Sequence, residues 1–331
     1  MSKRRDTDFL FISARLRGLE NQMLTQARME RMLEAKTNED AAKVLSECGY
    51  EDLVPLTAQT LERSLAQNRE ATFSELASMA PNPQIVDVFR MKYDYHNAKA
   101  LVKCIATGQD ASHLLIDAGR YPASQFLDAM KRDDLGALSS IFQQAITQAS
   151  DTLSATRDPQ RSDFILDRAY YEELSQVAAS SGSEFLEAYV RLMIDVANLK
   201  STVRTIRLHK NLEFLNAVIV DGGNVTRNLI ASVVTTGASL ETIFDGRLQS
   251  AAALGDAALK GGPQTAFEKS CDNALSSYLQ ENRLTPFGDS VLIAYAAAKE
   301  NEISAARIIL GGRLSGVPIP SIRERLRDAY V

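Results

Sequence analysis

The stretch FRMKYDYHNAKALVKCIAT, residues 89–107, carries the pattern that decides the fold. Its core reads Asp94-x-x-Asn97-x-Lys99, followed by an apolar pair and a second lysine. Asp94 and Asn97 are three residues apart, so on a helix they share one face. The same order of acid, amide and cation returns further along the chain, and this recurrence is the best guide to how the chain is organised.

Two more copies of the motif follow, the first beginning 101 residues later (94 to 195) and the next a further 107 residues later (195 to 302). They read Asp195-x-x-Asn198-x-Lys200 and Glu302-x-x-Ala305-x-Arg307. Each copy precedes a glycine-containing turn and a shorter apolar-patterned segment. We therefore predict three similar modules, residues 1–110, 111–215 and 216–331, with the two terminal segments free to pack together. This period is far longer than that of ordinary solenoid repeats, so the modules could stand in a row or close into a ring.

Helical periodicity and helix-boundary residues cover nearly the whole chain. Apolar residues at 9, 12, 16, 19 and 23 follow steps of three and four, which predicts one long helix over residues 8–35. The same signals predict helices over 58–79, 83–108, 183–210 and 289–310, and a last helix over 320–330. The best strand candidate, residues 218–220, is three residues long. The chain is therefore predicted to be all-α.

Composition excludes several classes of protein. The 331 residues are 45% hydrophobic and 24% charged, with 17 Gly and 9 Pro, which is typical of a soluble globular protein. A net charge of −5 gives no support for nucleic-acid binding. Cys48, Cys104 and Cys271 lie far apart and form no disulfide framework, so a reducing cytoplasm is the expected environment.

No targeting or membrane-spanning segment is predicted. The N-terminus carries basic residues, but its apolar run covers only residues 9–12, too short for a signal peptide. The longest later apolar stretch, residues 291–298, is too short to cross a bilayer. If the protein works at a membrane, we expect it to be held there by other proteins or at the surface.

No catalytic, cofactor-binding or metal-binding residue is predicted. The three histidines, at 96, 113 and 209, have no metal-ligand spacing to each other or to a cysteine. Neither a Gly-x-x-x-x-Gly-Lys-Ser/Thr loop nor a Gly-x-Ser-x-Gly elbow occurs. The pairs Gly261-Gly262 and Gly311-Gly312 are interpreted as helix stops. Glu172-Glu173 is interpreted as a solvated pair, and Tyr170-Tyr171 as packing groups.

Two features keep alternative interpretations. Asp94, Asn97 and Lys99 could form a polar contact surface, or could bond helix to helix inside each module; recurrence favours the structural role. Six basic residues also fall near the C-terminus: Lys299, Arg307, Arg313, Arg323, Arg325 and Arg327. On a helix Arg323 and Arg327 share a face, which is either solvated or a salt-sensitive docking surface.

The chain resembles the C subunit of the bacterial and archaeal V-type/A-type ATPases, which is named the d subunit in the eukaryotic vacuolar enzyme. The resemblance rests on residues 11–35, 89–103, 166–211 and 286–331, in this order and spacing, and covers essentially the whole chain. The second motif copy, Asp-x-x-Asn-Leu-Lys-x-x-x-Arg, lies within it. Ala305 stands where many relatives have Asn, which weakens only the third copy.

The resemblance implies a three-module, all-helical funnel with pseudo-threefold symmetry. It implies a non-catalytic rotor part between the proteolipid ring (c/K ring) and central stalk subunits D and F, with the membrane stator (the a/I subunit) as a further contact. Such a part serves ATP-driven H⁺ or Na⁺ transport, or ATP synthesis, at the cytoplasmic face of a membrane. It needs no cofactor, nucleic acid or small-molecule substrate. The alternatives are a helical scaffold of another assembly and an enzyme with an unrecognised site in a helical bundle.

Overall fold

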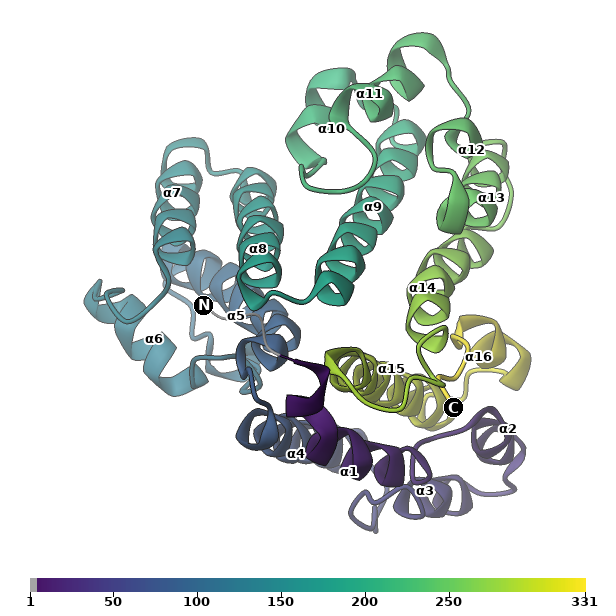
Figure 1. Ribbon diagram of the computed structural model, residues 1–331. Coiled ribbons are helices and arrows are strands. Elements are labelled where there is room, and N and C mark those ends of the chain that lie inside the picture. Colours follow the sequence, from purple (N-terminus) through teal and green to yellow (C-terminus); the bar gives the residue numbers. More distant parts are fainter. Residues whose placement is uncertain (1–4) are drawn as a thin grey trace. The chain divides into compact units, whose positions relative to one another are not determined.

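The computed structural model describes residues 5–331, so the basic residues Lys3 and Arg4 lie outside the described part. All regular elements among these residues are helices, and the candidate strand at 218–220 is instead the end of a short helix and an extended connection. The all-α prediction is therefore confirmed (Figure 1). The described chain divides into two compact units, residues 5–86 with 239–331, and residues 87–238.

The first unit joins the two ends of the chain. Its elements are η1 (Asp6–Phe9), α1 (Leu10–Glu20), α2 (Gln26–Glu34), α3 (Asn38–Ser46), α4 (Ala58–Met79), α12 (Leu240–Ile243), η3 (Gly246–Leu248), α13 (Gln249–Leu259), α14 (Gln264–Gln280), α15 (Asp289–Leu314) and α16 (Ile319–Arg325). Helix α15 is central, because it packs against α1, α2, α3, α4, α14 and α16. Its residues 290–300 are all buried, and residues 291–298 are all apolar, as expected of a helix surrounded by neighbours.

The second unit is built on the long helices α5, α8 and α9. Its elements are α5 (Gln84–Thr107), η2 (Ser112–Leu114), α6 (Ala123–Arg132), α7 (Ser140–Thr156), α8 (Pro159–Ser181), α9 (Glu184–Arg207), α10 (Leu212–Val218) and α11 (Arg227–Thr236). Helices α7 and α8 pack side by side, and α8 packs on α9 (Figure 1). Aromatic rings fill the core between α5, α6 and α7: Phe142 lies 4.5 Å from Tyr95 and 5.5 Å from Phe126, centroid to centroid.

The predicted long helix over residues 8–35 is wrong, because it is broken between α1 and α2. The Thr25 side chain caps α2 by accepting a hydrogen bond from Arg28 N at 3.2 Å. The break also frees the Leu24 N–H, which donates to the buried carboxylate of Glu302 at 2.6 Å. The apolar periodicity nevertheless identified buried positions on both sides of the end of α1, since Ile12, Leu16 and Met23 are all buried.

Two C-terminal predictions are also wrong. Helix α15 does not stop at Gly311-Gly312 but continues to Leu314. A Cβ on Gly312 would lie 2.8 Å from the Cδ1 of Ile322, so this glycine makes room for α16. The last helix ends at Arg325, and residues 326–331 continue without helical structure.

The two units do not coincide with the three modules expected from sequence spacing. The three-module division and the pseudo-threefold funnel therefore stay predictions. Among the described residues, none of the helices has the length and apolar character needed to cross a membrane.

Candidate functional site: the repeated acid–amide motif

The amide of the first motif copy bonds to the loop that follows its own helix. Asn97 lies on α5 and is fully buried. Its Nδ2 donates to the carbonyl of Ile116 at 2.8 Å, and its Oδ1 accepts from Ile116 N at 2.8 Å. One side chain thus satisfies both backbone polar groups of one loop residue, which would be costly to leave unpaired away from water.

The second copy repeats this exchange atom for atom. Asn198, on α9 and also fully buried, donates through Nδ2 to Val220 O and accepts at Oδ1 from Val220 N, both at 2.8 Å. In each copy the loop that returns to the motif follows the long helix. The repeat predicted from spacing is therefore present in the hydrogen bonding of these two copies.

The acid of each of these two copies accepts hydrogen bonds from the next residues of the same loop. Asp94 accepts from Arg120 Nε at 2.7 Å and from Tyr121 N at 3.4 Å. Asp195 accepts from Asn224 N at 3.0 Å, Asn224 Nδ2 at 2.7 Å and Val225 N at 3.1 Å. The two carboxylates thus hold equivalent turns, one through a guanidinium and the other through amides.

A glycine precedes the bonded turn in both copies because the loop approaches the carboxylate closely. A Cβ built on Gly119 would lie 2.0 Å from Asp94 Oδ1, and one built on Gly223 would lie 2.2 Å from Asp195 Oδ1. No side chain fits at these distances. The recurring glycine turns seen in the sequence therefore have a packing cause.

Burial makes both acids harder to ionise. It raises the pKa of Asp94 to about 6, with Arg120 acting in the opposite direction. It also raises the pKa of Asp195, against the hydrogen bonds from Val225 and Asn224.

Arg120 ties the first motif to helix α8. Besides Asp94 it binds Glu173, with Nη1 2.7 Å from Oε1, and Glu173 also accepts from the Tyr95 hydroxyl at 2.8 Å. Although burial opposes ionisation of Glu173, the bonds from Arg120 hold the pKa of this carboxyl below its usual value. The interpretation of Glu172-Glu173 as a solvated pair is thus wrong for Glu173, which is 4% exposed.

The tyrosine pair on the same helix packs as predicted. The ring of Tyr170 lies edge-on to Tyr95 and to Tyr171, at 5.5 Å and 4.8 Å between centroids. Burial raises the pKa of both hydroxyls of the pair.

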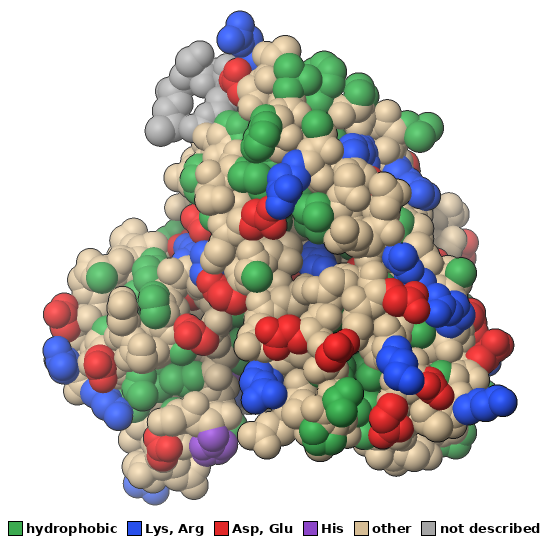
Figure 2. All heavy atoms as spheres, turned by 90° about the horizontal axis from the view of Figure 1, so that it is seen from below, with side chains coloured by type: hydrophobic (Ala, Val, Ile, Leu, Met, Phe, Trp, Pro, Cys, Tyr) green, Lys and Arg blue, Asp and Glu red, His purple; other side chains and the backbone are tan. Residues whose placement is uncertain are grey.

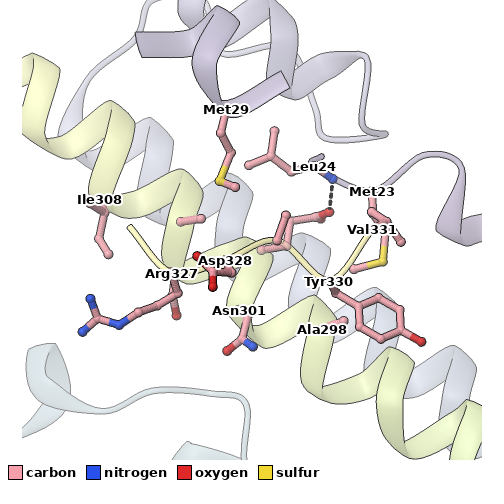
Figure 3. A pocket seen from close by; sticks show the side chains of 14 residues that line it. Met23, Leu24, Met29, Ala298, Asn301, Ile308, Arg327, Asp328, Tyr330 and Val331 are labelled. Atoms are coloured by element: carbon pink, nitrogen blue, oxygen red, sulfur yellow. Dashed lines mark hydrogen bonds between the residues drawn. The ribbon is translucent and has the colours of Figure 1, made fainter. Parts of the chain in front are cut away.

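The third copy uses its acid differently. Glu302 binds the Tyr50 hydroxyl at 2.7 Å, Leu24 N at 2.6 Å and Lys299 Nζ at 2.6 Å, all within the first unit. Ala305 has no amide with which to hold a loop. Figure 3 shows Leu24 and Met29 facing α15. They line a cavity of about 40 Å³ together with Arg327, Asp328, Tyr330 and Val331. This copy fastens the N-terminal segment rather than the turn after its own helix.

The cation of the motif pairs with a neighbouring long helix. Lys99 binds Asp167 on α8, and Arg307 binds Glu62 on α4 with Nε 2.7 Å from Oε1. Lys103, one turn further along α5, binds Asp163 at 2.7 Å. The motif therefore supports the structural interpretation, since its described groups bond to partners inside the chain.

The basic residues near the C-terminus are not one free face. Lys299 is buried against Glu302, and Arg313 donates to the carbonyls of Leu33, Ala35 and Thr37. Arg323 pairs with Glu30 at 2.8 Å, and Arg327, beyond the end of α16, pairs with Asp272 at 2.6 Å.

Arg323 and Arg327 are each paired within the unit but remain partly exposed, so a docking surface on them stays a prediction. The face drawn in Figure 2 shows acidic and basic side chains interspersed, without a large region of one sign. Over residues 5–331, no group of three or more His, Cys, Asp or Glu side chains is placed to hold a metal ion.

Comparison with known proteins shows the family of the chain. Residues 12–325 match the model of the family described as ATP synthase (C/AC39) subunit. The chain belongs to this family. It is 26% identical to the C subunit of the V-type sodium ATPase of Enterococcus hirae, over 95% of this chain and 97% of that protein.

Two archaeal relatives extend the comparison. The chain is 26% identical to the C subunit of the A-type ATP synthase of Halobacterium salinarum strain ATCC 29341, over 98% of this chain and 99% of that protein. Against the C subunit of the A-type ATP synthase of Thermococcus onnurineus, identity is 21% over 98% of this chain and 91% of the relative. This member of the C/AC39 family therefore spans nearly the full length of these relatives.

Three partners of the motif in this family member had no signal of their own in the sequence. Glu173 lies 79 positions after Asp94, Tyr50 lies 252 positions before Glu302, and Leu24 contributes only its backbone. Arg120 follows the glycine of the recurring turn, and this position was the one available clue. Contacts of such long sequence separation depend on tertiary packing, which spacing along one helix does not reveal.

Proposed function

We propose that this chain is the C subunit of a V-type/A-type ATPase. It acts as a non-catalytic rotor part that couples the central stalk subunits D and F to the membrane proteolipid ring. The family match over residues 12–325 is the observation that carries the proposal. The names of the relatives, which are C subunits of a V-type sodium ATPase and of A-type ATP synthases, support it.

The internal bonding of the motif fits a mechanical part better than an enzyme. The described acids and amides of the motif hold loops and helices, and the long helices are joined by buried networks such as Asp94–Arg120–Glu173. An adaptor that transmits torque must not yield, and dense helical packing provides that stiffness. Neither gripping the stalk nor gripping the ring requires a reacting group.

In this function ATP hydrolysis in the catalytic head turns the stalk, this chain passes the rotation to the ring, and the ring carries H⁺ or Na⁺ past the stator. Ion flow in the opposite direction drives ATP synthesis. The chain is then held at the cytoplasmic face of the membrane through its protein partners. The grip on those partners depends on complementary shape and charge over an extended contact.

A co-purification experiment tests the proposal. Tagged chain is mixed with the isolated D–F stalk complex and, separately, with the detergent-solubilised ring of the same organism. Retention of both, and of all three in one particle, is expected. Failure to retain either partner contradicts the adaptor function and favours a helical scaffold of another assembly.

A further inference from the structure

The second unit has a groove where the first half of α8 faces the turn from α9 into α10. Its volume is about 680 Å³, within the range of roughly 300–1,000 Å³ typical of ligand sites. Helix α10 packs against both α8 and α9 and so closes one side of it. The residues used below come from these elements: Asp158, Arg161, Phe164, Arg168, His209, Lys210, Glu213 and Phe214.

The groove combines an apolar floor with positioned cations. Phe164 and Phe214 meet edge to face, with 5.5 Å between centroids. Lys210 Nζ lies 5.7 Å from the centroid of Phe214, and Arg168 is oriented by one hydrogen bond, from Nη2 to Ala217 O at 3.1 Å.

Within the described chain neither cation lies within ion-pair distance of a carboxylate. The pKa of nearby Asp221 is lowered mainly by Arg227, which pairs with this carboxylate at 2.8 Å, and Arg168 contributes less, so neither groove cation is fully compensated.

The carboxylates of the groove do not neutralise these two cations. Asp158 caps α8 by accepting from Gln160 N at 2.9 Å, and it also pairs with Arg161 at 3.5 Å. Glu213 is then the one remaining carboxylate among the groove residues, and it faces two cations, Arg168 and Lys210. The groove is thus locally cationic on a chain whose net charge is −5.

A second observation is the backbone of His209, whose φ of +49° is left-handed. The position 101 residues earlier, the same interval that separates Asp94 from Asp195, is Gly108, with φ +68°. Both residues end a motif helix in the same way: Gln109 N bonds to Cys104 O at 2.9 Å, and Lys210 N bonds to Thr205 O at 3.0 Å. The fold therefore accepts glycine here, yet the second copy carries an imidazole on the groove.

A left-handed conformation costs a residue other than glycine about 1 kcal/mol. Asp133 and Arg157 also end helices in this conformation, so what distinguishes His209 is its place on the groove rather than its backbone alone. The His209 side chain is exposed and lies beside Lys210, where it extends the polar rim.

We propose that this groove binds an acidic segment of a neighbouring protein subunit. Its carboxylates lie on Arg168 and Lys210, an apolar side chain packs on Phe164 and Phe214, and His209 contacts the segment at the rim. The identity of the neighbour as a component of the ATPase rests on the proposed function. Charge complementarity of this kind sets the association rate and the register of an interface.

The test measures the affinity of labelled full-length chain for the ATPase complex depleted of it. The double variant Arg168→Glu with Lys210→Glu is expected to bind about tenfold more weakly and with a flatter salt dependence, because two favourable charge contacts become repulsive. The matched control is Lys131→Glu with Arg132→Glu, the same charge change at two exposed cations on α6. It is expected to bind as the unaltered chain does.

His209→Gly separates binding from folding. Relief of the left-handed strain should leave the melting temperature unchanged or higher, while loss of the imidazole weakens binding severalfold. If the unaltered chain binds and both groove variants bind equally well, the inference is overturned and the proposed function stands. If the unaltered chain does not bind, the proposed function fails instead.

An anionic lipid headgroup would offer the groove the same negative charge as an acidic protein segment. Vesicles of phosphatidylglycerol and phosphatidylcholine serve as the probe. The inference expects vesicle binding to be indifferent to Arg168→Glu with Lys210→Glu. Loss of vesicle binding, with unchanged affinity for the depleted complex, would assign the groove to a lipid headgroup and overturn the protein segment.

Discussion

A buried asparagine at position 97 or 198 does what no apolar side chain of similar volume can do. Its amide offers one donor and one acceptor to a single loop residue, so the loop can lie against the helix without unpaired backbone groups. Aspartate has the same shape but cannot donate. The role is therefore set by hydrogen-bond chemistry rather than by size.

The first prediction concerns Asn198. Asn198→Ala leaves the N–H and C=O of Val220 buried and unpaired, and the expected loss in free energy of unfolding is about 2–4 kcal/mol. Asn198→Asp should also destabilise, since its carboxylate repels Val220 O. Urea unfolding followed by circular dichroism measures both. The exposed Asn216→Ala on α10 is the control, expected to change stability by less than about 0.5 kcal/mol; equal stability of all three variants would show that the exchange with Val220 is unimportant.

The second prediction is a pH dependence carried by Asp94. Its pKa is about 6 when folded and about 3.9 in an unfolded chain. The folded state therefore holds this proton more tightly, so the contribution of Asp94 to stability is greatest at low pH and declines as pH rises from about 4 to about 6.

Asp94→Asn removes this titration. The stability of the variant relative to the unaltered chain should increase between pH 4 and 7, by on the order of 1–3 kcal/mol. Urea titrations across that range give the difference at each pH. A gap that stays constant would mean that Asp94 titrates alike in the folded and unfolded states, contrary to its burial beside Arg120 and Glu173.

At the residue scale the sequence revealed the motif but few of its partners. The spacing of Asp94 and Asn97 placed them on one helix face, and both side chains are buried there. Glu173 was misjudged because adjacent positions on a helix point about 100° apart, and only the packing decides which of Glu172 and Glu173 meets Arg120. That choice is not encoded in local charge patterning.

At the scale of the elements, the predicted helix bounds are accurate where local residues such as proline and glycine end the helix. The helix expected over 58–79 is α4, and the one expected over 83–108 is α5, ended by the left-handed Gly108. Expectations failed where another element intervenes. The break before Thr25 brings Leu24 N to Glu302, and α15 continues through Gly311-Gly312, where Gly312 lies against Ile322 of α16.

The third prediction uses that glycine pair as a matched comparison. Gly311→Ala meets no atom within 4 Å, so the gain in helix propensity should stabilise the protein by about 0.5–1 kcal/mol. Gly312→Ala meets Ile322, and displacing α16 should cost about 1–3 kcal/mol.

Thermal or urea unfolding of the two variants decides the matter. The expected result is a change of opposite sign at neighbouring positions of one helix. If both variants are stabilised to the same extent, the packing of Ile322 on Gly312 is not what requires a glycine. If both are destabilised, both positions would require glycine, as the helix stop predicted from the sequence implies.

At the scale of the whole molecule, the repeat is seen in the hydrogen bonds of the motif copies rather than in the bounds of the two compact units. Asn97 and Asn198 bind their loops identically, and Gly119 and Gly223 approach their acids equally closely. The third copy departs from this pattern because Glu302 binds the N-terminal segment, which joins the two chain ends in one unit. Spacing alone could not foresee this, since it depends on residues more than 250 positions apart.

The measurement that tests the rotor function most directly is coupling in a depleted complex. The ATPase without this chain is placed in vesicles, and ATP hydrolysis and ion uptake are recorded together before and after the purified chain is added. The adaptor function predicts that the depleted complex hydrolyses ATP with little ion uptake, and that added chain restores uptake while showing no hydrolysis by itself. Full uptake without the chain, or no recovery after its stable incorporation, would contradict it.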